Sequence, residues 1–171
     1  ITNCSNNYGF YQFPEKLIPL TIINCIDEKN IPIYGKGENL RDWIHVNDHC
    51  NAINLIINSS QTGEVFNIGA SNEIRNIDLV HKICSILDSV KPRSNNESYM
   101  NLINFVQDRP GHDFRYAINS SKINNILGWS PQINIDHGLE QTIKWYVKNE
   151  SWWRKIQSKG YKQERLGLNK T

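Results

Sequence analysis

The sequence predicts a folded α/β protein, and three observations support this class. Short extended segments rich in isoleucine, valine and phenylalanine alternate with segments whose apolar residues recur every three or four positions. The 171 residues are 39% hydrophobic and 21% charged and include five tryptophans, which is typical of a packed chain rather than a disordered one. By length alone the chain corresponds to one domain.

The first part of the chain predicts two strands and a helix. Residues 1–4 have the pattern of the end of a β-strand, and a polar loop follows over residues 5–9. Phe13-Pro14-Glu15 is typical of a helix start, and an apolar stripe predicts helix as far as Asp27, with Pro19 kinking or preceding its first regular turn. Residues 31–34 predict a short edge strand, because Pro32 cannot donate to a central ladder.

The middle of the chain predicts two further helices. Residues 42–46 are expected to be extended, and Asn47 or Asp48 is expected to cap a helix. The predicted inner face of this helix consists of Val46, Cys50, Ile53 and Ile57. Residues 64–69 predict a strand that ends at glycine. Asn76 is a plausible N-cap for the next helix, which carries Leu79, Val80, Ile83, Ile86 and Leu87 on its apolar face, and residues 91–101 are expected to form a loop.

The last part predicts a strand at residues 103–106, a loop at 107–113 and two helices. Ser120 or Ser121 is expected to cap a short helix closed by Gly128, and Asp136 to start the final helix. Trp152-Trp153 then precedes a basic tail over residues 154–171.

Charge and cysteine usage exclude several classes of protein. The net charge is +2, which argues against a strongly basic nucleic-acid binder. Residues 144–171 carry eight Lys and Arg against two Asp and Glu, but a solvated helix end is a better interpretation of this region than a nucleic-acid site. The four cysteines are irregularly spaced, the start has no secretory pattern, and the longest apolar stretch is too short to span a membrane. We expect a cytoplasmic protein with reduced thiols that binds neither nucleic acid nor membrane.

Two arginines are the strongest candidates for ligand contacts. Arg41 precedes Asp42 and Arg109 follows Asp108, each where α/β proteins place ligand-binding loops. Guanidinium groups bind phosphate oxygens bidentately, so the pair suits a diphosphate. A structural salt bridge to each adjacent acid is an equally good interpretation.

The other candidates are weaker when taken alone. Asn6-Asn7 can offer amide groups to a polar ligand, although an Asx turn is the better interpretation. Tyr34 can offer a flat face to a base, or is an ordinary half-buried strand aromatic. His45 and His49 are four residues apart, but a third ligand is missing, so no metal site is predicted. Nucleophile-elbow, Walker and Gly-x-Gly-x-x-Gly motifs are absent from the sequence. The residues by themselves therefore predict only an α/β domain that binds a phosphate-bearing ligand.

Several motifs in order resemble dTDP-glucose 4,6-dehydratases, a group within the extended short-chain dehydrogenase/reductase family. The two specific blocks are Phe-Pro-Glu-Lys-Leu-Ile-Pro at residues 13–19 and Asp-Arg-Pro-Gly-His-Asp at residues 108–113. The resemblance covers about residues 1–155 and includes Asn-Asn-Tyr-Gly at 6–9, Arg-Asp-Trp-Ile at 41–44 and Phe-Asn-Ile-Gly at 66–69. It departs from the usual pattern at Asn3, where arginine is common, and at Phe10, where proline is common.

The resemblance implies a two-part enzyme that binds NAD in a Rossmann domain and dTDP-glucose in a smaller domain. In such enzymes NAD oxidises the sugar at C4, water is eliminated across C5 and C6, and the hydride returns to C6. The family's Gly-rich turn, Tyr-x-x-x-Lys pair and Thr-Asp-Glu group belong to an N-terminal half that these residues do not match. We therefore expect no catalytic residue here, NAD bound mainly by that other half, and an inactive substrate-binding half of a homodimeric enzyme.

The resemblance also implies roles for particular residues. Asn7 is expected to lie on the cofactor side, and Arg41 and Arg109 to clamp the diphosphate. Pro32, Ile33 and Tyr34 are expected to cradle thymine. The full set of implied substrate contacts is Asn6, Lys16, Leu17, Pro32, Ile33, Tyr34, Arg41, Asn76, Arg109 and His112.

The same resemblance divides the chain into three parts. Residues 1–75 are expected to end the Rossmann domain with inserted pieces of the substrate domain, 76–153 to form mostly a small mixed α/β nucleotide-sugar-binding domain, and 154–171 to form the tail. Two alternatives stay open: a related nucleotide-sugar epimerase or decarboxylase, and a non-catalytic module that binds a nucleotide sugar.

Overall fold

The computed structural model describes residues 1–158, which fold as two compact units with interleaved segments. The first unit comprises residues 1–10, 38–76 and 113–142, and the second comprises 11–37, 77–112 and, within the described residues, 143–158. Each unit contains strands and helices, so the predicted α/β class is confirmed. No helix in the described part of the chain is long and apolar enough to cross a membrane.

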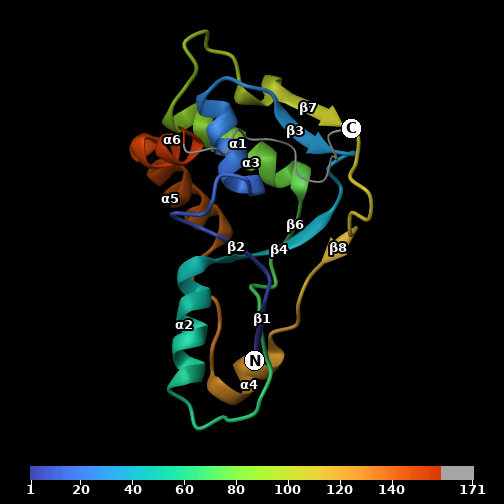
Figure 1. Ribbon diagram of the computed structural model, residues 1–171, viewed down its shortest axis with the longest axis vertical. Coiled ribbons are helices and arrows are strands. Elements are labelled where there is room, and N and C mark those ends of the chain that lie inside the picture. The colour runs from blue at the N-terminus through green and yellow to red at the C-terminus, as the bar shows by residue number, and fades with distance from the viewer. Residues whose placement is uncertain (159–171) are drawn as a thin grey trace. The chain divides into compact units, whose positions relative to one another are not determined.

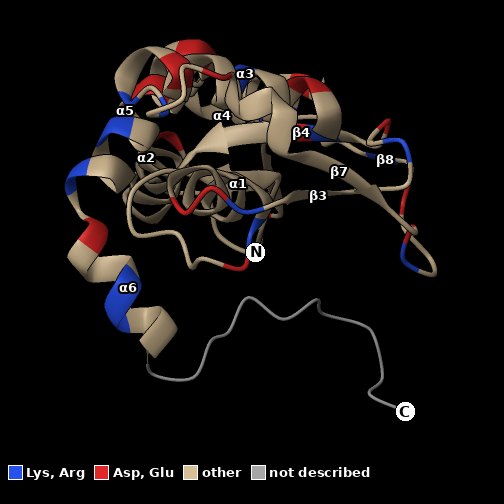
Figure 2. Cartoon of the chain, turned by 90° about the horizontal axis from the view of Figure 1, so that it is seen from above, with Lys and Arg blue, Asp and Glu red and all other residues tan. Residues whose placement is uncertain are grey.

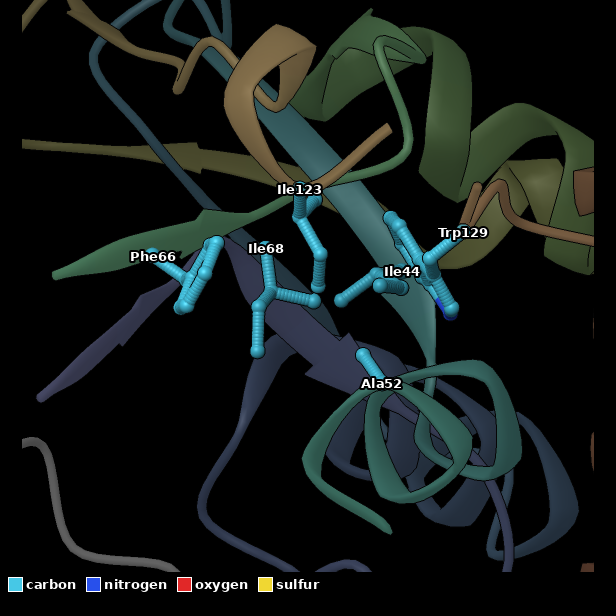
Figure 3. Packing of buried hydrophobic residues seen from close by; sticks show 6 residues of the cluster. All are labelled: Ile44, Ala52, Phe66, Ile68, Ile123 and Trp129. Atoms are coloured by element: carbon cyan, nitrogen blue, oxygen red, sulfur yellow. The ribbon is translucent and has the colours of Figure 1, made fainter. Parts of the chain in front are cut away.

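A pair of parallel strands and two helices enclose the core of the first unit (Figure 1). β1 (Thr2–Cys4) pairs with β5 (Phe66–Ile68), and the helices are α2 (Val46–Ile57) and α4 (Ser121–Leu127). The buried residues of this core come from four elements and the loop after α4, and Figure 3 shows them in contact: Ile44, Ala52, Phe66, Ile68, Ile123 and Trp129. Burying such side chains contributes about 1.5–3 kcal/mol each.

A second, mixed sheet in the first unit is built on β4 (Leu40–His45). Its neighbours are β2 (Asn6–Tyr8), which is parallel to it, β6 (Glu73–Arg75), which is antiparallel, and β8 (Arg115–Tyr116), which is parallel. The sequence predicted a loop at residues 5–9, and this was wrong for Asn6–Tyr8, because the register with β4 completes their backbone hydrogen bonding.

The second unit packs helices around a short parallel pair of strands (Figure 1). β3 (Ile31–Tyr34) pairs with β7 (Ile103–Val106), confirming both predicted strands. α1 (Leu17–Ile26) has Pro19 in its first turn, where proline costs no intrahelical hydrogen bond, and α3 runs over Asn76–Val90, its residues from 77 on lying in this unit. The predicted apolar face of α3 is largely confirmed, since Leu79, Val80, Ile83 and Leu87 are fully buried. The predicted loop at 91–101 ends in a 3-10 turn, η1 (Tyr99–Leu102).

Two helices end the described chain, and the second of them was not predicted. α5 spans Ile135–Lys148, one residue earlier than expected, and α6 spans Glu150–Ser158. Trp153 therefore lies inside a helix rather than ahead of a tail. Acidic and basic residues at opposite ends of α6, visible in Figure 2, match the helix dipole. Of the tail assigned to 154–171, residues 159–171 lie outside the described residues.

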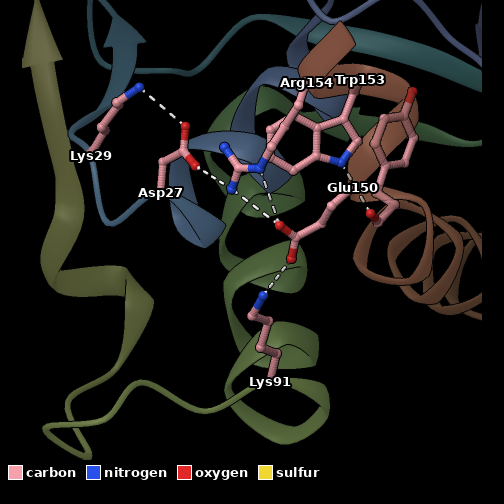
Figure 4. Close-up of polar contacts among 7 residues, drawn as sticks. Asp27, Lys29, Lys91, Glu150, Trp153 and Arg154 are labelled. Carbon is pink, nitrogen blue, oxygen red and sulfur yellow. Dashed lines mark hydrogen bonds and ion pairs between the residues drawn. The ribbon is translucent and has the colours of Figure 1, made fainter.

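A network of ion pairs ties α6 to the rest of the second unit (Figure 4). Glu150 accepts hydrogen bonds from Lys91 at 2.7 Å and from Arg154 at 3.1 Å, and Arg154 also binds Asp27 at 3.1 Å. These contacts lower the pKa of Glu150, mainly through the hydrogen bond from Lys91. Because the groups are partly exposed, each pair contributes at most about 1 kcal/mol, and the buried Trp153 beside them dominates the stability of α6.

The cap and inner face predicted for α2 were wrong. His45 is the N-cap, because its Nδ1 accepts the Asn47 N–H at 3.2 Å. The buried residues of this helix are Asp48 and Ala52, and Asp48 accepts the Ile133 N–H at 2.9 Å. A carboxylate can face the interior because that N–H satisfies it. Of the stripe that was predicted to face inward, Val46 and Ile53 are half-buried, whereas Cys50 and Ile57 are exposed.

Candidate functional site

The predicted binding residues fall into two groups, one in each unit. The first unit holds Asn6, Asn7, Arg41 and Asn76. The second unit holds Lys16, Leu17, Pro32, Ile33, Tyr34, Arg109 and His112.

In the second unit, strand pairing brings the loop after β7 beside the end of β3. Tyr34 is in register with Val106, and the Gly35 N–H donates to the Val106 carbonyl at 2.9 Å. Gly35 has φ +55°, and a Cβ there would lie 3.0 Å from the carboxylate of Asp108. A glycine is therefore required where the Asp-Arg-Pro-Gly-His-Asp loop crosses the end of β3.

Asp108 and His112 form a hydrogen-bonded pair inside this loop. His112 Nδ1 lies 2.7 Å from Asp108 Oδ1, and its side chain is almost fully buried. The hydrogen bond to His112 holds the pKa of Asp108 below its usual value. An ionised Asp108 fixes the proton on Nδ1, so in the neutral ring Nε2 is an acceptor. The edge of the His112 ring meets Tyr34 with centroids 6.3 Å apart, so this predicted residue and the predicted base platform are in contact.

The guanidinium of Arg109 is distinctive because, among the described residues, it makes no hydrogen bond and no ion pair. Its backbone N–H donates to Asp108 at 2.8 Å, but within the described chain its side chain makes no hydrogen bond or ion pair. The other arginines of residues 1–158 all have contacts: Arg41, Arg75, Arg93, Arg115 and Arg154. Within residues 1–158 Arg109 therefore forms no salt bridge with the adjacent acid, and its side chain is exposed on the loop that also carries His112.

The remaining residues of the second unit lie at the start of α1 and along β3. Lys16 is the N-cap residue of α1 and pairs with Glu15 at 2.7 Å while staying largely exposed. Leu17 is the first residue of that helix. On β3, Ile33 is buried, whereas Pro32 and Tyr34 are half-buried on the opposite face. Pro32 and Tyr34 are thus placed to offer a flat apolar surface, while Ile33 supports it from below.

In the first unit, the guanidinium of Arg41 is already hydrogen-bonded to backbone carbonyls. Its guanidinium donates to the carbonyls of Leu40 and Asp113, each at 2.7 Å, which holds the segment at 113–114 against β4. The neighbouring Asp42 does not pair with it and instead accepts the N–H groups of Ala70 and Asn72. A guanidinium has five N–H donors, so contact with a phosphate would use those that remain.

Two asparagines of the first unit, Asn7 and Asn76, differ in the hydrogen bonding of their side chains. Asn7 lies on β2, where its amide contacts Ser5 O, Cys4 Sγ and, at 2.8 Å, His49 Nδ1. Asn76 begins α3, and its side-chain Oδ1 is buried with no hydrogen-bond partner among residues 1–158. A buried unpaired carbonyl costs about 1–3 kcal/mol, so Asn76 is an acceptor available to a ligand.

His45, which sequence analysis considered only as a metal ligand, is a buried titratable group. It packs edge-to-face against Tyr8 and Phe10, and its Nε2 has no partner. Burial lowers the pKa of His45, an effect that Asp48 partly opposes. Within residues 1–158, His, Cys, Asp and Glu side chains form no group of three or more that could hold a metal ion.

Acidification is expected to destabilise the chain through His45. The unfolded chain protonates this imidazole near pH 6.5, whereas the folded chain does so only at lower pH, so stability is retained above pH 6.5 and falls below it. In urea unfolding between pH 7.5 and 5, His45→Phe should reduce the loss of stability. Some loss should remain, because burial also lowers the pKa of His49. The exposed His81→Gln is the control, and an unchanged slope in His45→Phe would contradict this account.

A groove of about 380 Å³ in the first unit lies apart from these residues. It is lined by side chains of α2 and of the loop after α4, among them Asn51, Asn54, Trp129 and Gln132. None of the predicted binding residues contributes to it. The candidate site is therefore defined by its side chains rather than by this groove.

Sequence reasoning missed the positioning role of Asp108. It considered Asp108 only as a salt-bridge partner for Arg109, whereas the carboxylate orients His112 and accepts the Arg109 backbone N–H. The available signal was the spacing, since Asp108 and His112 are four apart around a glycine that turns the chain at φ +66°.

Comparisons with known proteins agree with these motifs. A family model described as GDP-mannose 4,6 dehydratase matches residues 1–142. A dTDP-glucose 4,6-dehydratase from Escherichia coli is 51% identical over 98% of this chain, and one from Neisseria meningitidis is 47% identical over 99%. This chain spans about half the length of these relatives, 47% and 48% respectively.

Solved structures give the same result. The dTDP-glucose 4,6-dehydratase from Bacillus anthracis in complex with NAD is 45% identical, with a TM-score of 0.80, over 91% of this chain and 46% of that one. DesIV, a dTDP-glucose 4,6-dehydratase from Streptomyces venezuelae with NAD and TYD bound, is 40% identical with a TM-score of 0.81 over the same shares. The chain therefore belongs to the GDP-mannose 4,6 dehydratase family and, within it, is similar to dTDP-glucose 4,6-dehydratases.

Proposed function

We propose that this chain is the nucleotide-sugar-binding half of a dTDP-glucose 4,6-dehydratase, a lyase that yields dTDP-4-keto-6-deoxyglucose and water. The observation that carries the proposal is the unpaired guanidinium of Arg109 on the loop of the Asp108–His112 pair, next to Tyr34. A free cationic fork, a histidine of fixed tautomer and an aromatic face together suit the diphosphate and base of a nucleotide.

The chain's own residues bind and orient the substrate in this proposal. Arg109 binds the diphosphate, to which the family resemblance also assigns Arg41, and Pro32, Ile33 and Tyr34 support the thymine. His112, held by Asp108, presents Nε2 to the substrate, while Asn6, Lys16, Leu17 and Asn76 complete the contacts. Asn76 contributes a buried acceptor that otherwise has no partner.

NAD is the proposed cofactor, and when bound it would supply the hydride chemistry at C4 and C6 of the sugar. Of the residues in this chain only Asn7 is assigned to its side, and the Asn7 amide is engaged by Ser5 and His49. This fits a contributing rather than a holding role, so NAD would be bound mainly by the half of the relatives that this chain does not match. The complete enzyme would be a cytoplasmic homodimer, and residues 1–75 would belong mainly to its Rossmann domain.

Replacing Arg109 should weaken nucleotide binding selectively. Arg109→Gln removes a charge-assisted contact worth about 1.5–3 kcal/mol, which corresponds to at least a ten-fold rise in the Kd for dTDP. Calorimetric titration of the chain with dTDP measures this effect. Lys122→Gln is the matched control, because it removes the same charge from a surface pair with Glu64. Equal binding of dTDP by Arg109→Gln and the unmodified chain would contradict the proposed function.

A further inference from the structure

The groove of the first unit lies between helix α2 and the loop that follows α4. Its volume of about 380 Å³ falls within the range of about 300–1,000 Å³ that is usual for small-molecule sites. Side chains of α2 form one side of it, and residues 128–130 and 132 of the loop form the other. None of the predicted nucleotide-sugar contacts lines it, so any ligand it takes is a second one.

Asp48 lines this groove although its side chain belongs to the interior. The residue is only 2% exposed, and its Oδ2 accepts the Ile133 N–H at 2.9 Å, which ties the loop to α2. Its Oδ1 makes no hydrogen bond with any of residues 1–158, yet this oxygen is not enclosed by protein. A nearly buried carboxylate therefore leaves one acceptor open to the groove that it lines.

Trp129 supplies an open donor from the loop side of the groove. Its side chain is 7% exposed, and most of the ring belongs to the core cluster of the first unit. A buried indole N–H usually has a hydrogen-bond partner, but Nε1 of Trp129 has none among the described residues and is not enclosed by protein either. The groove thus holds an unused donor and an unused acceptor on two residues that are otherwise buried.

Three asparagines line the helical side of the groove. Asn51 and Asn54 of α2 and its C-cap residue Asn58 are three and four residues apart, so they share one side of the helix. Asn58 Nδ2 donates to the Asn54 carbonyl at 2.8 Å and to Asn54 Oδ1 at 3.2 Å, whereas the Asn51 side chain makes no hydrogen bond with the described residues. Exposed asparagines alone are typical of a solvated helix, but here they adjoin the open groups of Asp48 and Trp129.

The lining groups select the class of ligand. Among the described residues no Lys, Arg or His lines the groove, so a phosphate or other anion would meet the Asp48 carboxylate without a counter-charge. A small cation would suit the carboxylate but would leave the Trp129 N–H without an acceptor. A hydroxyl group both donates and accepts, so a compound with several hydroxyl groups satisfies the carboxylate, the indole and the amides together.

We propose that this groove is a second small-molecule site, which binds an uncharged polyhydroxylated compound of the monosaccharide class. Asp48 Oδ1 accepts a hydrogen bond from one sugar hydroxyl, Trp129 Nε1 donates to another, and the amide of Asn51 binds a third. Leu55, which is 36% exposed and lines the groove, offers an apolar contact to the C–H groups of the sugar ring. This site is separate from the proposed nucleotide-sugar site and does not depend on it.

Titration of the 171-residue chain with D-glucose, followed by nuclear magnetic resonance, tests the proposal. The sequence contains five tryptophans, so the indole N–H signal of Trp129 is readily resolved and assigned. We expect D-glucose to shift this signal with a Kd in the millimolar range, which is ordinary for so small a ligand, and dTDP to leave it in place. Asn51→Ala should raise the Kd for D-glucose about three- to ten-fold, as expected for one neutral hydrogen bond.

Asn125→Ala is the matched control, because Asn125 is an exposed asparagine of α4 in the same unit and does not line the groove. It should bind D-glucose as the unmodified chain does, and circular dichroism should show that all variants fold. Asp48→Asn keeps an oxygen for the Ile133 N–H but turns a donor toward the groove, so it should weaken binding at least as much as Asn51→Ala. An unmoved Trp129 signal, an equal Kd in Asn51→Ala, or a shift caused by ethanolamine and not by D-glucose would overturn the proposal.

Discussion

Replacing Trp153 by alanine is expected to lower the free energy of unfolding by about 3–5 kcal/mol, the usual range for removing a large buried aromatic side chain. Trp153 is fully buried in the second unit, and its indole N–H donates to the Tyr146 carbonyl at 3.1 Å. The guanidinium of Arg154 lies over the indole at 4.3 Å. The substitution therefore leaves a cavity, an unpaired carbonyl and a cation without its aromatic surface.

Urea unfolding followed by near-ultraviolet circular dichroism measures this loss. Arg154→Gln is the matched control, because it removes the cation and its ion pairs with Asp27 and Glu150 but leaves the indole in place. It should cost no more than about 1 kcal/mol, since those pairs are partly exposed. A loss below 1 kcal/mol in Trp153→Ala would show that α6 does not pack into the core.

Replacing Asp42 by alanine is expected to cost about 2–4 kcal/mol. Asp42 is fully buried, and its two oxygens accept the N–H groups of Ala70 at 3.1 Å and Asn72 at 2.7 Å. Alanine takes the acceptor away from two part-buried donors, at about 1–3 kcal/mol each.

Asp42→Asn is the informative comparison. One oxygen remains to accept a backbone N–H, while the amide nitrogen meets the other as a second donor. Its loss of stability in urea unfolding should lie between those of the unmodified chain and Asp42→Ala. If both variants unfold at the urea concentration of the unmodified chain, the loop at residues 69–72 does not depend on this carboxylate.

Local sequence patterns predicted those elements whose own residues show a clear apolar period or a β-branched run. α3, β3 and β7 have apolar stripes or β-branched runs, and their predicted positions were confirmed, whereas α1 begins at Leu17 rather than at the predicted start over residues 13–15. β6 and β8 were missed because they are two or three residues long and exist only through pairing with β4. For β8 the register joins Leu40 to Arg115, far apart in sequence, which no local pattern encodes.

Burial was harder to predict than periodicity. The stripe on α2 has the spacing of a core face, but which side of a helix is buried depends on the segments around it. In this chain the side with Asp48 and Ala52 is buried, because the Ile133 N–H satisfies the carboxylate. Helix α6 was not predicted, because its sequence is mostly polar and Trp153 is its only buried residue.

The candidate site was predictable where a motif carries it. The sequence itself predicted Arg109 and Tyr34 as binding residues, and the family resemblance added His112. All three lie in one unit, in which the loop of residues 108–113 crosses the end of β3 at Gly35. The backbone contacts of Arg41 and the orienting hydrogen bond of Asp108 were not predictable, because both depend on the path of residues 108–114. The assigned binding roles remain predictions.

The most direct test of the account is the product that forms when this chain is joined in one polypeptide to the unmatched half of the Escherichia coli relative. Mass spectrometry of dTDP-glucose incubated with the fusion and NAD should show a nucleotide sugar lighter by one water. The same fusion carrying Arg109→Gln should form it much more slowly at low substrate concentration. A product of unchanged mass, as an epimerase would give, or no product from a folded fusion that binds NAD, would contradict the central claim.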